Sequence, residues 1–455
     1  MIGDCIRRPY GYINSRYALI LLYSKSFKYS IHVLLGSLEY NGFDKLMDIY
    51  LVDIDKCLFK DILDFTSRLC NMYRYVILGS TIYTTQLYTL LPLYNELSNL
   101  KRRYSNLILV AGGPHASGDP SGVLRLGFDI AFIGESEISF PSYLKSLIDG
   151  GDVFKTPGIA YLEDNRIRFN KVVRVGSLDE YPPYAVRAGL YNPIELTRGC
   201  PFGCGFCQVT RLFGVVPRHR SIDNVIENVE CMIRVGVRDI RFITPNSLGY
   251  GSRDGVKPEL DILEEFLSRL HNIVVSRYGG RIFYGSFPSE ARPEFVSEDT
   301  ARILKKYTSG KRVIIGAQSG SNRVLKLLNR GHLIEDVLNA VEILRRYDFR
   351  VDVDFIFGLP YEDDEDVELT IKAMERIIEL GGIIHAHYFM PLPATPLFKY
   401  KPKPIHPKIL KFLNKYEGRG RVFGYWRRQI DISYKILELI EKGVISSSFN
   451  RGVES

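Results

Sequence analysis

Mostly apolar runs of strand length alternate with helix-like segments over the first third of the chain. The runs are Ala18–Tyr23, Lys45–Val52, Tyr75–Leu78, Leu107–Ala111 and Asp129–Ile133. Segments such as Gln86–Leu100 and Ser139–Leu147 separate them and have the composition of helices. Strands that are apolar throughout, rather than alternating with polar residues, are typical of a parallel sheet covered on both faces. The pattern therefore predicts an α/β domain with a doubly wound sheet over residues 1–150.

Five short strands in about 150 residues fit the flavodoxin-like (Rossmann-like) version of that architecture. Ligands of such sheets bind at the carboxyl ends of the strands. Ser80 follows the third run and Gly112-Gly113 follow the fourth. We therefore expect these three residues to lie on the ligand-binding edge of the sheet.

A second series of strand and helix patterns begins after a proline-rich segment. Residues 154–179 are hairpin-like and precede Tyr181-Pro182-Pro183-Tyr184, so we assign residues 151–189 to a linker. Six strand-like runs follow, near Pro193–Leu196, Asp239–Thr244, Arg281–Ser286, Val313–Ala317, Arg350–Phe357 and Ile384–Met390. They predict a partial (β/α)6 barrel over residues 190–400, with its site on the loops after the strands. Residues 401–455 are expected to form a helical C-terminal extension.

Composition and charge narrow the class of protein. Of the 455 residues, 45% are hydrophobic and 25% are charged, which is the balance of a folded globular protein rather than a disordered one. The net charge of +8 is compatible with acidic ligands or RNA, but it is spread along the chain as on a solvated surface. The sequence has no apolar run of membrane-spanning length and no apolar signal-peptide core, so we expect a cytoplasmic protein without a membrane partner.

The cysteines point to metal binding rather than to a disulfide framework. There are seven, an odd number, and Cys200, Cys204 and Cys207 lie within eight residues. We interpret Cys5, Cys57 and Cys70, which are scattered, as buried or free thiols.

The cysteine triplet follows the first strand of the predicted barrel. Thiolates are the usual ligands of iron–sulfur clusters, and three of them on a glycine-containing loop suit three irons of a four-iron cluster. Cys231 falls within a predicted helix, so no fourth ligand is nearby and one iron is left open. A structural zinc site normally has four protein ligands. The spacing therefore favours a catalytic [4Fe-4S] cluster over zinc or no metal.

The spacing Cys-x3-Cys-x2-Cys, with the aromatic Phe206 before the last cysteine, resembles the signature of the radical S-adenosylmethionine (SAM) superfamily. The resemblance implies that SAM binds the open iron through its amino and carboxylate groups. It further implies an electron donor such as ferredoxin or flavodoxin, reductive cleavage of SAM, and a 5′-deoxyadenosyl radical that abstracts hydrogen from a substrate. Phe206 is then a candidate cofactor contact.

Later motifs are similar to those of the same family, in the same order. Glu290, in Tyr284–Pro293, is a candidate contact for the SAM amino group, or else an ordinary acid at a helix entry. Gln318 and Ser319 lie in a motif that usually reads Glu or Gln before Ser-Gly-Ser. We expect Glu290, Gln318 and Arg330 to converge in one pocket facing the cysteines.

Arg330 and Gly358 complete the candidate SAM contacts. Gln318 and Arg330 are candidates for the SAM ribose and carboxylate, and arginine has the geometry to bind a carboxylate. The alternative for Arg330 is a charge that satisfies carbonyls at a helix end. Gly358, in Asp354–Pro360, is expected to let the backbone approach adenine. The match is weaker at Ala394, where the family usually has glycine, and at Thr244–Ser247, where an acidic contact is missing.

Residues 1–150 resemble the cobalamin-binding domains that precede some radical SAM enzymes. The resemblance rests on Val110–Ala116 and on Ile133–Glu137. It implies that Gly112 and Gly113 let the backbone approach the nucleotide tail of cobalamin, and that Ser80 hydrogen-bonds its dimethylbenzimidazole. The alternative is a scaffold that has lost the cofactor. The Asp-x-His-x-x-Gly element is absent around His32, so we expect cobalt without a histidine ligand; His115 either faces the corrin or caps a turn.

The leading hypothesis is a cobalamin-dependent radical SAM methyltransferase that acts on an unreactive carbon. A radical rearrangement or ring contraction, and methylthiotransferase-like chemistry, are enzymatic alternatives. Methylthiotransferases carry a second cysteine set upstream, whose sequence setting Cys5, Cys57 and Cys70 do not share. A non-enzymatic corrinoid-binding sensor would not need an open iron. The substrate is unknown, and nucleic acid is not excluded. The basic and aromatic Arg419–Arg428 either covers the barrel mouth or is a plain helix end.

Overall fold

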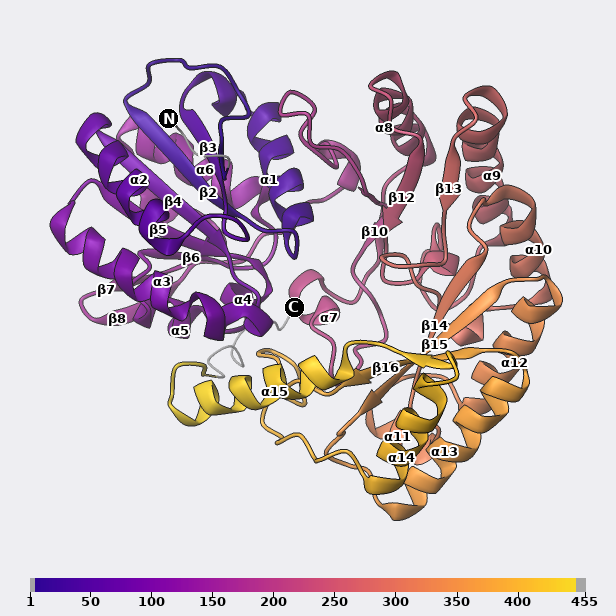
Figure 1. The fold of residues 1–455 in the computed structure, drawn as a ribbon. Helices are drawn as coiled ribbons and strands as arrows, with labels where there is room; N and C mark the ends of the chain where they lie inside the picture. Colours follow the sequence, from indigo (N-terminus) through magenta and orange to yellow (C-terminus); the bar gives the residue numbers. More distant parts are fainter. Residues whose placement is uncertain (1–4, 447–455) are drawn as a thin grey trace.

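The computed structural model describes residues 5–446, and its N-terminal half is a parallel sheet between two layers of helices (Figure 1). The sheet contains β2 (Tyr17–Tyr23), β3 (Asp48–Asp53), β4 (Tyr75–Thr81), β5 (Leu107–Gly112) and β6 (Ile130–Phe132). Their order in space is β3-β2-β4-β5-β6, and every neighbouring pair is parallel. This is the flavodoxin-like order, so the predicted fold class is confirmed.

Helices cover both faces of this sheet. α1 (Lys28–Tyr40) and α6 (Ser136–Asp149) pack on one face. α2 (Phe59–Met72), α3 (Thr84–Arg103) and α5 (Pro120–Arg125) pack on the other. The sheet is longer than predicted because β1 (Ile6–Arg7) pairs antiparallel with β3, and the hairpin β7 (Ile159–Glu163)–β8 (Arg166–Phe169) continues past β6. The hairpin that we placed in the linker is thus the last part of the sheet.

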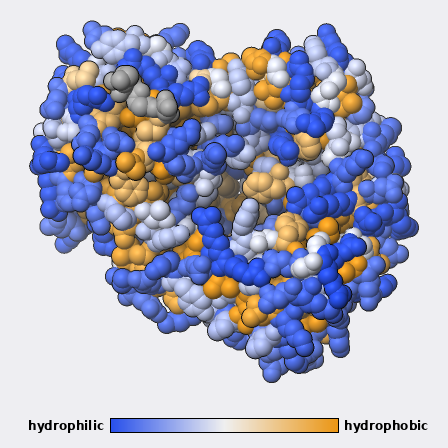
Figure 2. All heavy atoms as spheres, viewed as in Figure 1, coloured by the Kyte–Doolittle hydropathy of each residue, from blue (hydrophilic) through white to orange (hydrophobic). Residues whose placement is uncertain are grey.

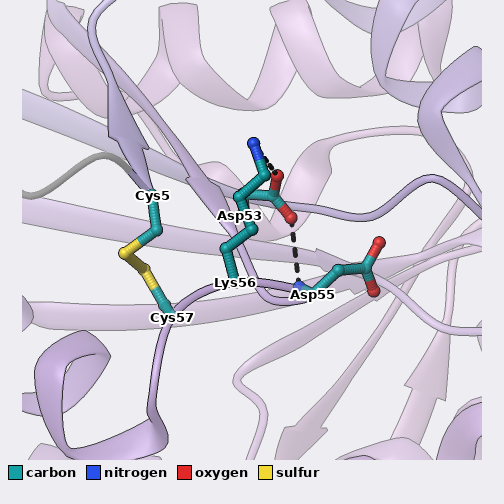
Figure 3. Close-up of a disulfide and its surroundings, with 5 residues drawn as sticks. All are labelled: Cys5, Asp53, Asp55, Lys56 and Cys57. Atoms are coloured by element: carbon teal, nitrogen blue, oxygen red, sulfur yellow. Dashed lines mark hydrogen bonds and ion pairs between the residues drawn. A yellow bond between two sulfur atoms is a disulfide. The ribbon is translucent and has the colours of Figure 1, made fainter.

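A disulfide joins Cys5 to Cys57, across 52 positions of sequence (Figure 3). The pairing of β1 with β3 brings Cys5 beside the loop after β3, where the Asp53 amide donates a hydrogen bond to the Cys5 carbonyl. The interpretation of these two cysteines as thiols was therefore wrong. Cys70 is a buried free thiol, as expected.

The second half is an open parallel barrel. Its strands are β9 (Ile194–Glu195), β12 (Asp239–Ile243), β13 (Arg281–Phe283), β14 (Arg312–Gln318), β15 (Arg350–Phe357) and β16 (Ile383–Tyr388). They form two sheets, β13-β12-β9 and β14-β15-β16-β17, joined by one parallel bridge between Ala291 and Ile315. All six predicted strands are present, and the short β17 (Val422–Phe423) adds a seventh.

An outer layer of helices covers the barrel strands. These are α8 (Ile222–Arg234), α9 (Leu260–His271), α10 (Glu298–Tyr307), α12 (Ile334–Arg346) and α13 (Asp364–Glu379). Short elements at the strand ends are β10 (Thr197–Arg198), α7 (Val209–Phe213), β11 (Arg218–His219) and α11 (Asn322–Leu327). Among residues 5–446, no helix has the length and apolar character needed to cross a membrane.

The described part of the chain ends with two helices, α14 (Pro407–Glu417) and α15 (Trp426–Glu441), so the helical extension is confirmed as far as it is described; its residues 447–455 lie outside the described residues. α15 reaches from the barrel to the N-terminal half (Figure 1). Trp426 is buried in the barrel core, whereas Ile436 and Leu439 are buried in the core beneath α3. Arg419–Arg428, for which both a cover of the barrel mouth and a plain helix end were considered, contains β17 and the start of α15.

Candidate active site

The cysteine loop, residues 199–207, joins β10 to α7. Gly199 adopts a φ of +94°, and a side chain there would lie 2.4 Å from the Val216 carbonyl oxygen, so the turn requires glycine. Cys204 is buried and Cys200 and Cys207 are half-buried. Burial raises the pKa of Cys200 and raises that of Cys207 to about 11. Because metals bind the thiolate form, a cation that replaces the thiol protons suits this loop.

Two buried arginines face Cys204. Nη1 of Arg330 lies 3.2 Å and Nη1 of Arg292 3.9 Å from its Sγ. Arg292 also sits over the ring of Phe202, 3.4 Å from its centre. Cations beside a sulfur favour negative charge on it. The donor set therefore fits an iron–sulfur cluster held by three thiolates, which is itself anionic.

Gln318 and Arg330 are brought together at this loop. Nη2 of Arg330 donates to the Gly316 carbonyl at 2.8 Å. A side chain on Gly316 would lie 2.5 Å from Nε2 of Gln318 and 3.2 Å from Nη2 of Arg330, so both side chains occupy the space above it. A register shift between Gly316 and Gln318, and a φ of +76° at Gln318, turn the glutamine back over the strand. The geometry is compatible with a shared ligand; their contacts with SAM stay a prediction.

Three other predicted SAM contacts have structural roles of their own. The Ser319 hydroxyl is buried, accepts a hydrogen bond from the Ser321 amide and lies 3.5 Å from the Thr370 hydroxyl. Gly358 has a φ of +76°, and a side chain on it would lie 2.4 Å from the ring of Tyr388. Phe206 packs against a small apolar cluster that includes Leu328. These contacts shape the loops, and the proposed roles at SAM remain untested.

Glu290 has Asp354, His387 and Arg312 as its electrostatic neighbours. Burial and the charge of Asp354 raise the pKa of its carboxyl to about 7, while His387 and Arg312 act in the opposite direction. Its electrostatic neighbours are thus residues of β14, β15 and β16. That Glu290 shares one pocket with Gln318 and Arg330 remains a prediction.

Next to Glu290 lies a group that the sequence analysis missed, here named the lumen triad: Asp354, His385 and His387. Asp354 on β15 is the register partner of His385 on β16. Burial alone would raise the pKa of the Asp354 carboxyl, but hydrogen bonds from His385 and His387 hold it below its ordinary value. The available signal was polar residues at alternate positions of strands that are otherwise apolar.

Ser80, Gly112 and Gly113, here named the glycine edge, lie together at the carboxyl ends of β4 and β5, as predicted. They line a cavity of about 720 Å³ whose opposite wall includes Glu195, Leu212 and Phe287 of the barrel half. The molecular surface is hollowed between the two halves (Figure 2). This volume is within the range of pockets that hold large organic ligands.

Side chains play little part at the glycine edge. A side chain on Gly112 would have no neighbour closer than 3.9 Å, whereas one on Gly113, at a φ of +90°, would meet Thr81 at 2.8 Å. The Ser80 hydroxyl is hydrogen-bonded to that of Tyr94 at 2.9 Å. The backbone at Gly112 is therefore open to a ligand.

The two histidines of the N-terminal half differ in position. His32 lines the cavity, and burial lowers its pKa to about 4, so the ring is neutral at pH 7. His115 is fully buried on α4 (Gly113–Gly118), with Nδ1 2.9 Å from the Thr84 hydroxyl, and is not among the residues lining the cavity. His115 thus stabilises the turn rather than facing the cavity.

Buried ion pairs connect the two halves beside the cavity. Arg198, just before the cysteine loop, lies 3.0 Å from Glu135, 2.7 Å from Glu137 and 2.6 Å from Glu195. Arg218 is also paired with Glu135. The Ile133–Glu137 segment, which resembles a motif of cobalamin-binding domains, therefore holds the strand that leads into the cysteine loop.

One side chain joins the two loops directly. Gln208, the residue after Cys207, donates through Nε2 to the carbonyls of Pro114 at 3.4 Å and Pro393 at 2.9 Å. Pro114 follows Gly112-Gly113. The loop that carries the cysteines and the loop that carries the glycines are thus in contact.

The protein thus has two α/β parts, a flavodoxin-like domain and a partial barrel. The cysteine loop at the mouth of the barrel is a candidate iron–sulfur site. Residues 194–374 match the sequence model of the Radical SAM superfamily, so the chain contains a radical SAM domain. The resemblance seen in the cysteine spacing is confirmed.

Curated relatives extend the similarity beyond that domain. An uncharacterized protein of Methanocaldococcus jannaschii is 26% identical over 65% of this chain and 65% of its own length. An uncharacterized methyltransferase of Pyrococcus horikoshii is 25% identical over 71% of this chain and 69% of its own. A tRNA-2-methylthio-N(6)-dimethylallyladenosine synthase of Petrotoga mobilis is 29% identical over half of each chain. The chain thus spans 65% and 50% of the length of the first and third of these relatives, and 69% of the length of the methyltransferase.

Solved structures share the fold of both halves. The radical S-adenosylmethionine methyltransferase TsrM from Kitasatospora setae, with cobalamin and a [4Fe-4S] cluster bound, has a TM-score of 0.64 at 18% identity and covers 84% of this chain and 74% of its own. The cobalamin-dependent S-adenosylmethionine radical enzyme OxsB, with aqua-cobalamin and S-adenosylmethionine bound, has a TM-score of 0.65 at 14% identity and covers 97% and 63%. At these identities the likeness establishes the fold.

Proposed function

We propose that the chain is a cobalamin-dependent radical SAM methyltransferase that acts on an unreactive carbon. One observation carries the proposal: a single cavity lies between the glycine edge and the barrel half, and α7, which follows the cysteine loop, contributes Leu212 and Phe213 to its wall. A methyl donor and a radical generator must reach the same substrate atom, so their sites have to share a cavity.

The residues present fit the three implied cofactors. Cys200, Cys204 and Cys207 would hold the cluster, Gln318 and Arg330 would contact SAM, and the glycine edge would hold cobalamin. When bound, the cluster supplies the electron for cleavage of SAM, and cobalamin supplies the methyl group. Support comes from the radical SAM domain and from the fold shared with two cobalamin-dependent enzymes.

The chain's own side chains position these sites. The ion pairs of Arg198 fix β10 against the start of α6. Gln208 holds the cysteine loop against Pro114. Reacting atoms must approach to about 3–3.5 Å, so the two edges need such direct links.

Methylthiotransferase chemistry is the second candidate, since one relative is a methylthio-tRNA synthase. The cysteines disfavour it. Outside the loop, Cys5 and Cys57 are bonded to each other, Cys70 is buried, and Cys231 lies on α8. These residues do not form a second cluster-binding set. A radical rearrangement is a further enzymatic alternative, since it would use the same proposed cofactors.

The test is anaerobic purification with iron, sulfide and hydroxocobalamin, followed by measurement of iron, bound corrinoid and transfer of an isotope-labelled methyl group from SAM to the corrinoid. A Cβ at Gly112 meets no protein atom closer than 3.9 Å, and Gly112 lines the cavity, so Gly112→Val should abolish corrinoid binding while iron is retained. Gly151→Val, at a surface position with ordinary contacts, is the matched control.

Two results would contradict the proposal. Equal corrinoid binding by wild type and Gly112→Val would place the cofactor elsewhere. A protein that cleaves SAM but binds no corrinoid would be a radical SAM enzyme whose N-terminal domain serves another purpose. A corrinoid that binds but never receives the methyl label would favour the rearrangement chemistry.

A further inference from the structure

The lumen triad presents three ligand atoms at one point of the barrel interior. Nδ1 of His385 lies 2.8 Å from Oδ1 of Asp354 and 3.1 Å from Nε2 of His387, and that Nε2 lies 3.6 Å from the same Oδ1. We infer that Asp354, His385 and His387 bind one divalent transition-metal ion, of the Zn²⁺ or Fe²⁺ class. This site is additional to the cysteine loop and independent of the proposed function.

The separations are those of ligands that share a metal ion. Nitrogen and oxygen ligands lie about 2.0–2.2 Å from zinc, so two of them at tetrahedral or octahedral angles are about 2.8–3.6 Å apart. All three observed distances fall in that interval. Two histidines and one carboxylate also form a ligand set that holds Fe²⁺ or Zn²⁺ with coordination positions left open.

Hydrogen bonds alone do not account for the three contacts. A ring nitrogen carries either a hydrogen or a lone pair. If Nδ1 of His385 and Nε2 of His387 both carry a hydrogen, each can donate to Asp354, but the two N–H groups then oppose each other at 3.1 Å. If Nδ1 carries the lone pair, it opposes a carboxylate oxygen at 2.8 Å. A cation at the centre accepts a lone pair from each of the three atoms.

The surrounding residues hold the ligands in place. Asp354 and His385 are neighbours in register on adjacent parallel strands, which are rigid elements. The His385 ring stacks on Phe423, with centres 4.3 Å apart and planes within 4°. Nδ1 of His387, the nitrogen that would not bind metal, lies 3.3 Å from Nε2 of Gln429 on α15. This amide N–H donates to His387, and the Gln429 oxygen accepts from the Tyr388 amide. Binding of a metal at Nε2 puts the ring hydrogen on Nδ1, so the Gln429 amide must turn away when the metal binds.

The position in the barrel gives the site access to a ligand. His385 and His387 retain 21% and 28% exposed side-chain surface, so the open coordination positions face solvent in the lumen. Asp354 is the register partner of Gly316, above which Gln318 and Arg330 lie. An oxygen donor of a bound molecule, such as a carboxylate or hydroxyl group, can complete the coordination there.

The test uses the full chain carrying Cys200→Ala, Cys204→Ala and Cys207→Ala, so that zinc cannot bind the cysteine loop. Equilibrium dialysis against Zn²⁺ should give one bound ion per chain, and Zn²⁺ should raise the melting temperature. Adding His385→Ala and His387→Ala should abolish both effects. Gln429→Ala should not weaken zinc binding, because it removes an amide N–H that competes for the His387 ring. His271→Ala, on α9 outside the barrel, is the matched control and should change neither.

The cluster-loaded protein supplies the second measurement. Cluster content, measured as acid-labile sulfide, should be the same in the reconstituted wild type and in its His385→Ala/His387→Ala variant, because the two sites are separate. The inference is overturned if zinc binds equally with and without the histidines. It is also overturned if the triple cysteine variant, with the lumen triad intact, binds no zinc and Asp354→Asn in the cluster-loaded protein lowers SAM affinity. Asp354 would then belong to the SAM site alone.

Discussion

The glycine edge and the cysteine loop are in contact through Gln208 and Pro114, yet they are built in opposite ways. At the glycine edge the ligand-facing groups are backbone atoms, and Gly112 leaves open space where a side chain would be. At the cysteine loop the groups are side chains, three thiols with Arg292 and Arg330 beside them.

The difference follows from what each site is proposed to hold. A large, mostly uncharged ligand is bound by removing side chains so that the backbone can approach it. A small, charged cofactor is bound by placing opposite charges and donor atoms around it. Substitutions at the loop should therefore have large effects on charge and metal content, and substitutions of side chains near the glycine edge should have small ones.

The largest effect is expected at the loop. Changing Cys200, Cys204 and Cys207 together to Ala should remove all specifically bound iron and all SAM cleavage, because no other cysteine reaches the site. Iron and sulfide analysis after anaerobic reconstitution measures this. Cys231→Ala is the control on α8, and iron loss there equal to that of the triple variant would show that the ligands are assigned wrongly.

The second-largest effect is expected from the buried ion pairs of Arg198, which connect the two regions. Arg198→Met leaves Glu135, Glu137 and Glu195 around a buried position without their cation, which costs about 3–5 kcal/mol of stability. Chemical denaturation measures it. Arg269→Met removes an exposed ion pair and should cost under about 1 kcal/mol. Equal losses would mean that the buried pairs contribute no more than surface ones.

Arg330 sharpens the comparison within the loop. Arg330→Leu removes a charged donor beside Cys204 and Gln318, and a charged hydrogen bond contributes about 1.5–3 kcal/mol, so SAM affinity should fall about 10- to 100-fold. Iron content should fall much less, because the cysteines remain. Calorimetric titration with SAM checks the affinity, with the exposed Arg302→Leu as control. Loss of iron without loss of affinity would make Arg330 a partner of the cluster only.

A smaller effect, which depends on pH, is expected from Glu135. Burial raises the pKa of its carboxyl, but the hydrogen bond from Arg218 and the charges of Arg198 and Arg218 outweigh burial and hold it below its ordinary value. A carboxyl with a lowered folded pKa stabilises the protein above its unfolded pKa and loses that contribution as the pH falls. Stability should therefore decline below about pH 4.5, and Glu135→Gln should flatten the decline.

The smallest effect is expected from His32→Ala at the cavity. The ring is neutral and available, but the sequence lacks the element that accompanies a histidine ligand of cobalt, so the visible spectrum of bound cobalamin should not change. A shifted spectrum would show that a side chain is a principal ligand at the glycine edge. That result would contradict the difference drawn between the two sites. Gly112→Val provides the reference for complete loss of binding.

Local patterns in the sequence predicted the fold and the cysteine loop. The strands of both halves are apolar runs bounded by loops, and the three cysteines and Gly112-Gly113 are contiguous motifs. Features formed by residues that are far apart in the sequence were not predicted. Cys5 meets Cys57 only because β1 pairs with β3, and Asp354 meets His385 only through strand register. A single sequence does not indicate such pairings.

α15 has one further consequence. Its first turn is part of the barrel core, and its later turns are part of the core of the N-terminal half. Both hydrophobic cores therefore depend on the same helix. Loss of either half exposes apolar surface on α15. The two halves are therefore thermodynamically one cooperative unit, and heating should give a single calorimetric transition although the chain holds two folds.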